Sequence, residues 1–209
     1  MDKKEALAIL FRSAEVYKNH MVGRNYAIIY SEKGKPVIIQ TKASKSNFLH
    51  LTGLDTKLNP SEFFELCLNK RLKVEDFKFD TGGFAKLKLS VIEKVLYFES
   101  FPKMIVHFDR YRPNLYCEKI AGTIYACIGF TQINGFYIPN TVLAEDSRNF
   151  SDKPSMRILA ILSKKDKELL YNIVHMVSKK CIEILKQADT WIKSNTSSEI
   201  YCSLYNKAE

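Results

Sequence analysis

One histidine stands out as a candidate for proton transfer. His50 lies in the segment Phe-Leu-His-Leu-Thr-Gly, residues 48–53, and an imidazole with an unperturbed pKa of about 6.5 can accept or donate a proton near neutral pH. Its apolar neighbours can anchor a helix, while His50 and Thr52 present polar atoms beside Gly53, where a backbone can approach closely. The segment is a candidate acid–base site, and a structural histidine that hydrogen-bonds a carbonyl group is the alternative.

Aromatic and basic side chains could contact a nucleic acid. Tyr26, Tyr125 and Tyr137 could stack on unpaired bases, although aromatic residues in alternating strands more often pack in a core or pair across strands. Arg110-Tyr111-Arg112 could clamp a phosphate, with a solvated turn before Pro113 as the alternative. Neither group establishes a function by itself.

Several kinds of enzyme site are missing from the sequence. The four histidines are dispersed, and no H-x-x-x-H, H-E-x-x-H or clustered carboxylate motif is present. The G-x-S-x-G motif of serine hydrolases, the Walker loop of NTPases and the glycine fingerprint of dinucleotide-binding enzymes are also missing. We therefore expect neither a metal nor another cofactor.

The charge balance favours an acidic partner. Lys and Arg number 32 against 23 Asp and Glu, which gives a formal net charge of +9. A nucleic acid is one such partner, because cations that neutralise phosphates release counterions. Charge of this size also serves solubility, so it does not by itself establish RNA binding.

The cysteines and the hydropathy favour a cytoplasmic protein. The five cysteines are odd in number, scattered and never arranged as C-x-x-C, so we expect reduced thiols rather than disulfides or a zinc site. No apolar run approaches the roughly 18 residues of a membrane helix, and the N-terminal segment contains acids, unlike a signal peptide. We expect no membrane partner.

A helix and a hairpin are predicted before the His50 segment. Apolar residues recur at three- and four-residue steps over 7–21, which predicts a packed helix that ends at Gly23. Two β-rich runs, 25–31 and 36–41, flank a short connection that contains Gly34, which predicts an antiparallel hairpin.

Three helices are predicted next. Residues 44–53 begin with capping residues and end at a glycine, which predicts a short helix that carries His50. Asn59-Pro60-Ser61-Glu62 supplies an N-cap, a proline at the first helical position and a capping-box acid for the second. Apolar spacing over 84–95 predicts the third. We interpret residues 59–100 as a helical insert.

Strands dominate the second half. Four runs rich in Ile, Val, Tyr and Phe predict strands at 104–108, 123–130, 136–143 and 156–162. Apolar residues at helical spacing then predict a C-terminal helix over roughly 165–187. The polar tail beyond Trp191 is expected to be loosely held. The whole chain, 1–209, is predicted to be one α+β domain with an antiparallel sheet of about four to six strands and helices at the N-terminus, middle and C-terminus.

Four segments, in this order, resemble one protein family. They are F-x-H-L-T-G around His50, the helix start at 59–64, the strand 137–141 and the strand 158–164. They resemble a phage- and mobile-element-associated nuclease family of the Barnase/EndoU/colicin/RelE-like (BECR) superfamily, over roughly residues 25–171. The resemblance implies helices packed on an antiparallel sheet and metal-independent cleavage of RNA.

The resemblance also implies roles for individual residues. In that superfamily the 2′-hydroxyl of RNA attacks the adjacent phosphate, which requires a proton acceptor, a proton donor and cations, but no metal. Carried over by motif, His50 would be the general base or acid, and Thr52 a phosphate or backbone contact. Asn140 and Thr141 would orient the substrate. The cations that offset phosphate charge would be Lys42 and Lys164.

The sequence therefore predicts a metal-independent endoribonuclease or toxin-like RNase of a mobile genetic element. RNA would be its substrate, and a protein antitoxin or immunity protein a possible partner. One alternative is a catalytically inactive RNA-binding module on the same scaffold, which would bind RNA in a salt-dependent manner without cutting it. The other is a protein-interaction factor of the same element, whose basic surface meets an acidic protein.

Overall fold

The computed structural model describes residues 1–110, 112 and 115–206. Its helices are α1 (Lys3–His20), α2 (Asn47–Thr52), α3 (Pro60–Leu68), α4 (Phe84–Leu96), α5 (Ile182–Lys186), α6 (Asp189–Asn195) and α7 (Ser198–Asn206), with short 3-10 helices at Ser147–Phe150 and Lys179–Cys181. Its strands are β1 (Arg24–Glu32), β2 (Lys35–Lys42), β3 (Asp55–Thr56), β4 (Phe77–Lys78), β5 (Met104–His107), β6 (Lys119–Gly122), β7 (Cys127–Ile133), β8 (Phe136–Leu143), β9 (Met156–Lys165) and β10 (Ile173–Val177). The predicted α+β class is confirmed.

Seven strands of the main sheet are paired in a closed circuit. The strand order is β1-β2-β8-β7-β6-β5-β9-β10, and β9 pairs with β1 as well, so that β10 extends the sheet from β9. The pairing of β2 with β8 is parallel and consists of one register pair, Thr41 with Tyr137, whereas the other pairings between the named strands are antiparallel. The sheet has eight strands, more than the predicted four to six.

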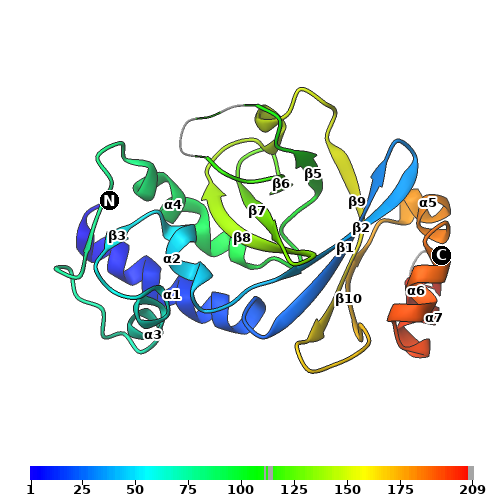
Figure 1. The fold of residues 1–209 in the computed structure, drawn as a ribbon, viewed down its shortest axis with the longest axis horizontal. Helices are drawn as coiled ribbons and strands as arrows, with labels where there is room; N and C mark the ends of the chain where they lie inside the picture. Colours follow the sequence, from blue (N-terminus) through cyan, green and yellow to red (C-terminus); the bar gives the residue numbers. More distant parts are fainter. Residues whose placement is uncertain (111, 113–114, 207–209) are drawn as a thin grey trace.

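Helices cover the strands on two sides. Figure 1 shows α1 to α4 gathered on one side of the strands and α5 to α7 on the other. Because side chains alternate along a strand, β1 contributes to two cores. Tyr26, Ile28 and Tyr30 belong to the core that fills the circuit and continues under α1 to α4, whereas Ala27 and Ile29 belong to the core under α5 to α7.

The predicted N-terminal helices are confirmed. Asp2 and Glu5 form a capping box at the start of α1, Asn59 caps α3 before Pro60, and α2 ends at a left-handed Gly53 with φ 69°. The ring of Phe48 on α2 lies 5.3 Å from Tyr17 on α1 and 5.4 Å from Phe64 on α3. These aromatic contacts fix the position of α2, and hence of His50.

The predicted turn at Gly34 is confirmed, and a second hairpin turns in the same way. The β1–β2 hairpin turns at Lys33 and Gly34, with φ 50° and 77°, and the β7–β8 hairpin turns at Asn134 and Gly135, with φ 49° and 82°. Two consecutive residues with positive φ match the right-handed twist of the flanking strands, and glycine adopts them without a steric cost.

The C-terminal helix predicted over 165–187 is wrong for most of that range. β9 continues to Lys165, and Ile173–Val177 forms β10, which pairs with residues 160–163 of β9. Within that range the chain forms only a 3-10 turn at Lys179–Cys181 and the α-helix Ile182–Lys186. The β-branched residues of β10 suit a strand, and the edge of β9 supplies hydrogen bonds that local apolar spacing does not reveal.

The tail beyond Trp191 is packed, in contrast to the expectation. It forms part of α6 and all of α7 up to Asn206, and Leu204 is fully buried in the core under these helices. Tyr201 donates a hydrogen bond of 2.6 Å to Asp189. Among the described residues, no helix has the length and apolar character that would let it cross a membrane.

Candidate active site

The two predicted residues of α2 differ in exposure. His50 is exposed in the last turn of α2. Thr52 is fully buried, and its hydroxyl donates a 2.7 Å hydrogen bond to the Leu49 carbonyl and accepts a 3.2 Å hydrogen bond from the Leu54 amide. Thr52 therefore closes the end of α2 and has no surface for contact with a phosphate.

The two predicted residues of β8 belong to its pairing with β7. The register shifts there, with Gly129 opposite Thr141 and Phe130 opposite Pro139, so Asn140 is the bulged residue. Its amide donates a 2.7 Å hydrogen bond to the Tyr116 carbonyl. Thr141 is 5% exposed. Asn140 therefore ties β8 to the backbone at Tyr116, and Thr141 is buried in the sheet.

The two predicted lysines lie on either side of β1. Asn25 pairs with Lys42 on β2 and with Lys164 on β9, and it shares a strand face with the core under α5 to α7. Lys164 donates a 2.7 Å hydrogen bond to the Leu169 carbonyl, and the ammonium of Lys42 lies 4.3 Å from the ring centroid of Phe136. These lysines start from the face opposite to the core that anchors α2.

The predicted site is thus not brought together in one pocket. Among the described residues, none of the six with a carried-over catalytic role lines either of two pockets, whereas Tyr137, a candidate for stacking on a base, lines one of them. The arginine pair is neutralised as well: Arg112 makes two hydrogen bonds to Glu145, of 2.7 and 2.8 Å, and Arg110 makes one of 2.7 Å to Asp152. Tyr111 lies outside the described residues.

A different group of charged residues meets at one end of the strand circuit. We call Glu32, His107 and Lys119 the acid–base cluster. Glu32 ends β1, His107 ends β5, and Lys119 begins β6 directly opposite His107. Each lies two residues from a residue of the core inside the circuit, so each side chain starts from the inward face of its strand. Those core residues are Tyr30, Ile105 and Ala121.

Hydrogen bonds join the three side chains in a chain. His107 Nε2 lies 2.8 Å from Glu32 Oε1, and Lys119 Nζ lies 3.3 Å from His107 Nδ1. Since a lysine ammonium only donates hydrogen bonds, protonated Lys119 donates to Nδ1. The neutral imidazole then carries its proton on Nε2 and donates it to the carboxylate. His107 therefore links a carboxylate to an ammonium group.

The surroundings change the acidity of both end groups. The hydrogen bond from His107 lowers the pKa of Glu32 below its ordinary value of 4.5. Lys119 is 7% exposed, and burial lowers its pKa below 10.5, although the nearby Glu32 and Glu118 act in the opposite direction. The cluster thus combines an ionised carboxylate with an ammonium group that releases its proton more readily than an exposed lysine, which is a combination suited to general acid–base chemistry.

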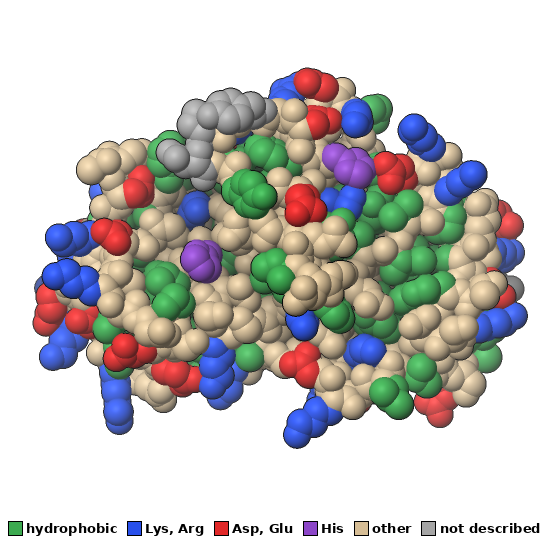
Figure 2. All heavy atoms as spheres, viewed as in Figure 1, with side chains coloured by type: hydrophobic (Ala, Val, Ile, Leu, Met, Phe, Trp, Pro, Cys, Tyr) green, Lys and Arg blue, Asp and Glu red, His purple; other side chains and the backbone are tan. Residues whose placement is uncertain are grey.

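The cluster opens into a pocket of about 610 Å³, which we call the β2–β8 pocket. It forms because, among the described residues, Thr41 is the only residue of β2 that pairs with β8, so the rest of β2 diverges from the β7–β8 hairpin. Figure 2 shows hydrophobic side chains gathered over β1 and β2, bordered by a histidine with acidic and basic neighbours. The pocket is lined by Tyr30, Glu32, Val37, Ile38, Ile39, Gln40, Lys119, Gln132, Gly135, Tyr137 and Trp191.

Aromatic rings surround the lysine of the cluster. The ammonium of Lys119 lies 5.5 Å from the ring centroid of Tyr30 and 5.8 Å from that of Tyr137. The Tyr30 hydroxyl is buried without a hydrogen-bond partner among the described residues. A polar group or water bound in the pocket would satisfy it.

Sequence reasoning missed this cluster. Glu32 and His107 are 75 residues apart, and His107 and Lys119 are 12 apart, so only the strand pairing brings them together. The signal present in the sequence was a charged or titratable residue at the end of an otherwise apolar alternating run. That signal is ambiguous, because most such residues point into solvent.

A second polar cluster lies near the opposite end of β1. His20 Nδ1 lies 2.5 Å from Glu99 Oε1, and Ser163 Oγ lies 2.7 Å from His175 Nε2. Burial lowers the pKa of His175, and Ser163 is fully buried. These residues line neither of the two pockets, and a buried serine is unavailable to a substrate. We therefore assign this cluster a structural role.

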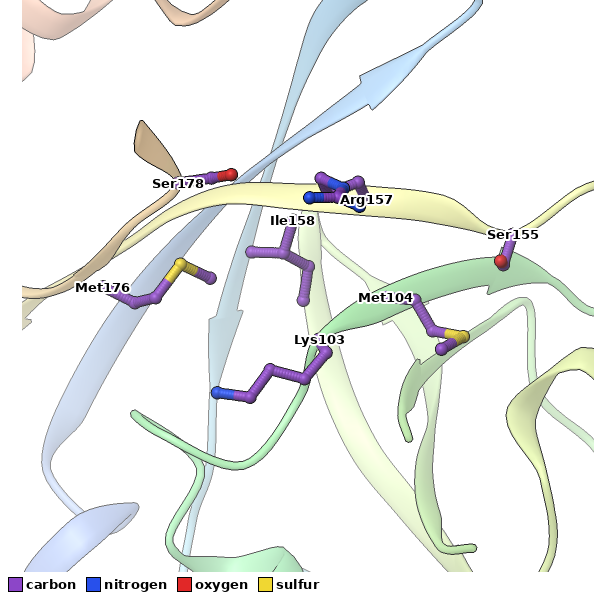
Figure 3. A pocket seen from close by; sticks show the side chains of 7 residues that line it. All are labelled: Lys103, Met104, Ser155, Arg157, Ile158, Met176 and Ser178. Carbon is purple, nitrogen blue, oxygen red and sulfur yellow. The ribbon is translucent and has the colours of Figure 1, made fainter. Parts of the chain in front are cut away.

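A second pocket, of about 460 Å³, lies between β5, β9 and the end of β10. Figure 3 shows Lys103 and Arg157 at this pocket together with Met104, Ile158 and Met176. Two serines complete the lining, which contains no carboxylate or histidine. Lys103 and Arg157 could bind an anion there, but the pocket lacks the proton acceptor that the acid–base cluster supplies.

Comparison with known protein families gives one match. Residues 9–180, from α1 to the start of the C-terminal helices, match the family described as phage-Barnase-EndoU-ColicinE5/D-RelE like nuclease4. Neither the curated proteins nor the solved structures contain a significant match. The matched range includes the whole acid–base cluster and the strands that close the circuit. Because the match covers most of the chain, this protein belongs to the phage-Barnase-EndoU-ColicinE5/D-RelE like nuclease4 family.

Proposed function

We propose that this nuclease is a metal-independent endoribonuclease and that the acid–base cluster is its catalytic centre. The observation that carries the proposal is the hydrogen-bonded chain from Glu32 through His107 to Lys119 at the wall of the β2–β8 pocket. Cleavage by the 2′-hydroxyl of RNA needs a base, an acid and a cation near the phosphate. Glu32 supplies the base, and Lys119 supplies both the acid and the cation.

The reaction would proceed in one displacement at phosphorus. Glu32 accepts the proton of the 2′-hydroxyl, the 2′-oxygen forms a bond to phosphorus, and the bond from phosphorus to the 5′-oxygen breaks. Lys119 donates a proton to the leaving 5′-oxygen, and its charge offsets the negative charge that develops on the phosphate. His107 holds the base and the acid at a fixed separation. The products are a 2′,3′-cyclic phosphate and a 5′-hydroxyl.

The proposed biological role is that of a toxin-like RNase of a mobile genetic element, acting on RNA in the cytoplasm. The phage association in the family description and the net charge of +9 support this role. Such an enzyme needs an inhibitor in its own host, so a protein antitoxin or immunity protein is the expected partner. The alternative placement of the centre is at His50, which is exposed on α2, although Lys42, Asn140 and Lys164 do not join it in either pocket.

The reaction type is tested with purified protein and matched oligonucleotides in EDTA. We expect cleavage of RNA with 2′,3′-cyclic phosphate and 5′-hydroxyl ends, and no cleavage of the same sequence with 2′-deoxyribose. Cleavage of both oligonucleotides, or cleavage of RNA only after a divalent metal ion is added, would refute the proposed chemistry. Binding of RNA without any cleavage would instead support the inactive RNA-binding alternative.

A further inference from the structure

The β2–β8 pocket extends well beyond the acid–base cluster. Two of its lining residues are glutamines, Gln40 and Gln132, and the chain contains only three glutamines. A glutamine amide offers two hydrogen-bond donors and an acceptor in one plane. The pocket therefore presents two planar amide groups in addition to its charges.

Strand pairing fixes one of these amides beside an aromatic ring. Tyr137 pairs with Gln132 in the β7–β8 ladder and with Thr41 in the single β2–β8 pair, and Gln40 is the neighbour of Thr41 on β2. Residues on paired strands are positioned more precisely than residues on a loop. Tyr137 and Gln132 thus form a preformed pair, and Gln40, whose side chain starts from the other face of β2, lines the same pocket.

An indole ring reaches the same pocket from another element. Trp191 lies on α6 and lines the pocket together with Ile38 of β2. Its ring is 5.8 Å from that of Tyr171, in the core under α5 to α7, so its position is set by packing. The pocket is therefore bordered by aromatic rings on two separate elements, Tyr137 on β8 and Trp191 on α6.

The edge of β2 adds backbone groups to this lining. Before Thr41, β2 pairs with β1 but with no residue of β8 among those that the structure describes. Val37, Ile38, Ile39 and Gln40 all line the pocket. The backbone groups on this edge that point away from β1 are available to a ligand.

We infer that this part of the pocket binds one unpaired nucleobase next to the scissile phosphate and thereby sets the sequence preference of the cut. A nucleobase is planar and carries donors and acceptors on its edge, so it can stack on aromatic rings while amides read that edge. A volume of about 610 Å³ is ample for one nucleotide. Lys119, whose ammonium group lies 5.8 Å from the ring centroid of Tyr137, suits the attached phosphate. The effect on where RNA is cut rests on the proposed function, whereas binding of the nucleobase does not.

Binding is tested without catalysis through the fluorescence of Trp191, which is the only tryptophan in the chain. The probes are trinucleotides of 2′-deoxy A, C, G or T, which lack the attacking hydroxyl. We expect a saturable fluorescence change at a lower concentration for one base than for the others. Gln40→Leu and Gln132→Leu should each weaken that binding about threefold to tenfold, as the loss of one or two hydrogen bonds predicts.

A matched control is available in Gln187→Leu, because Gln187 follows α5 and is not part of the pocket lining. This variant should bind the preferred trinucleotide as the wild type does. Thermal unfolding of all three variants shows whether each is folded. Equal affinity for all four bases, or unchanged affinity in both pocket variants, would overturn the inference.

Cleavage mapping separates this inference from the proposed function. Wild-type cut sites in a mixed RNA should be enriched for the base that binds most tightly. Gln132→Leu should reduce that enrichment, whereas Gln187→Leu should leave it unchanged. If the protein binds one base preferentially but cuts no RNA, the proposed function fails and the base site stands. If it cuts RNA with no base preference, the base site fails and the proposed function stands.

Discussion

Lys119 shows how its surroundings prepare a side chain for chemistry. Lys119 is almost completely buried. Its ammonium group lies 5.5 Å from the ring centroid of Tyr30 and 5.8 Å from that of Tyr137, and it hydrogen-bonds to His107. Burial disfavours the charged form, and this lowers the pKa of Lys119. An exposed lysine would hold its proton more tightly. At the scale of single residues, the proposed acid is therefore a cation whose pKa is lowered by burial.

The pH dependence of cleavage follows from the two shifted groups. The rate should rise with pH as Glu32 loses its proton, at a pH below the ordinary 4.5 because its pKa is lowered. It should fall again as Lys119 loses its proton, at a pH below 10.5. Rate constants measured across this range test both limbs. A rate that is independent of pH throughout would contradict these roles.

Lys119→Arg separates proton donation from simple charge. Arginine keeps the positive charge but does not release its proton at accessible pH, so the rate should fall about 10²- to 10⁴-fold. Affinity for an uncleavable RNA should change far less. A near wild-type rate in this variant would show that Lys119 acts only through its charge.

At the scale of elements, local signals predicted some segments and failed for others. Capping residues and apolar spacing predicted α1, α2 and α3, because those signals act within a few residues. β10 was mistaken for helix, since its stability comes from the edge of β9. β6 was missed because it is four residues long and ends in glycine. Both failures concern strands whose partners are distant in sequence.

The pairing of β10 with β9 includes a histidine that should make stability depend on pH. Burial lowers the pKa of His175 in the folded state below the ordinary 6.5, so the unfolded chain binds this proton more readily. The free energy of unfolding should therefore fall as pH drops below about 6.5. Denaturant unfolding of the wild type and His175→Asn measures the difference. If both proteins show the same pH slope, the histidine does not contribute.

The packing of α7 can be measured directly. Leu204 is fully buried, so Leu204→Ala should lower the free energy of unfolding by about 2–5 kcal/mol. Leu169 is 88% exposed and provides the matched control, because Leu169→Ala should change stability by less than about 0.5 kcal/mol. Equal and small effects in the two variants would mean that the tail is as loosely held as its composition indicates.

At the scale of the whole molecule, closure of the strand circuit brings the acid–base cluster together. Glu32, His107 and Lys119 come from three strands, and they meet because β9 pairs with both β1 and β5. The segment around His50 can be recognised in the sequence because all its residues are adjacent. The fold class and the nuclease family could be predicted from such segments. The acid–base cluster could not, because it depends on the register of the whole sheet.

The basic charge of the molecule should make RNA binding depend on salt. Each phosphate that the protein neutralises contributes about −0.7 to the slope of log affinity against log salt concentration for a single strand. We expect a clearly negative slope for an uncleavable RNA. Lys164→Gln should leave the slope unchanged, because Lys164 starts from the strand face opposite to the acid–base cluster and does not line the β2–β8 pocket. A shallower slope in this variant would restore its predicted contact with phosphate.

The most direct test of the acid–base cluster compares two variants on one RNA substrate in EDTA. Glu32→Gln keeps an oxygen that can accept the hydrogen bond from His107 but removes the base, so single-turnover cleavage should slow by about 10²- to 10⁴-fold. His50→Ala should cleave at the wild-type rate, since His50 lies on α2 outside the pocket. Loss of cleavage in His50→Ala with a normal rate in Glu32→Gln would contradict the account and place the centre on α2.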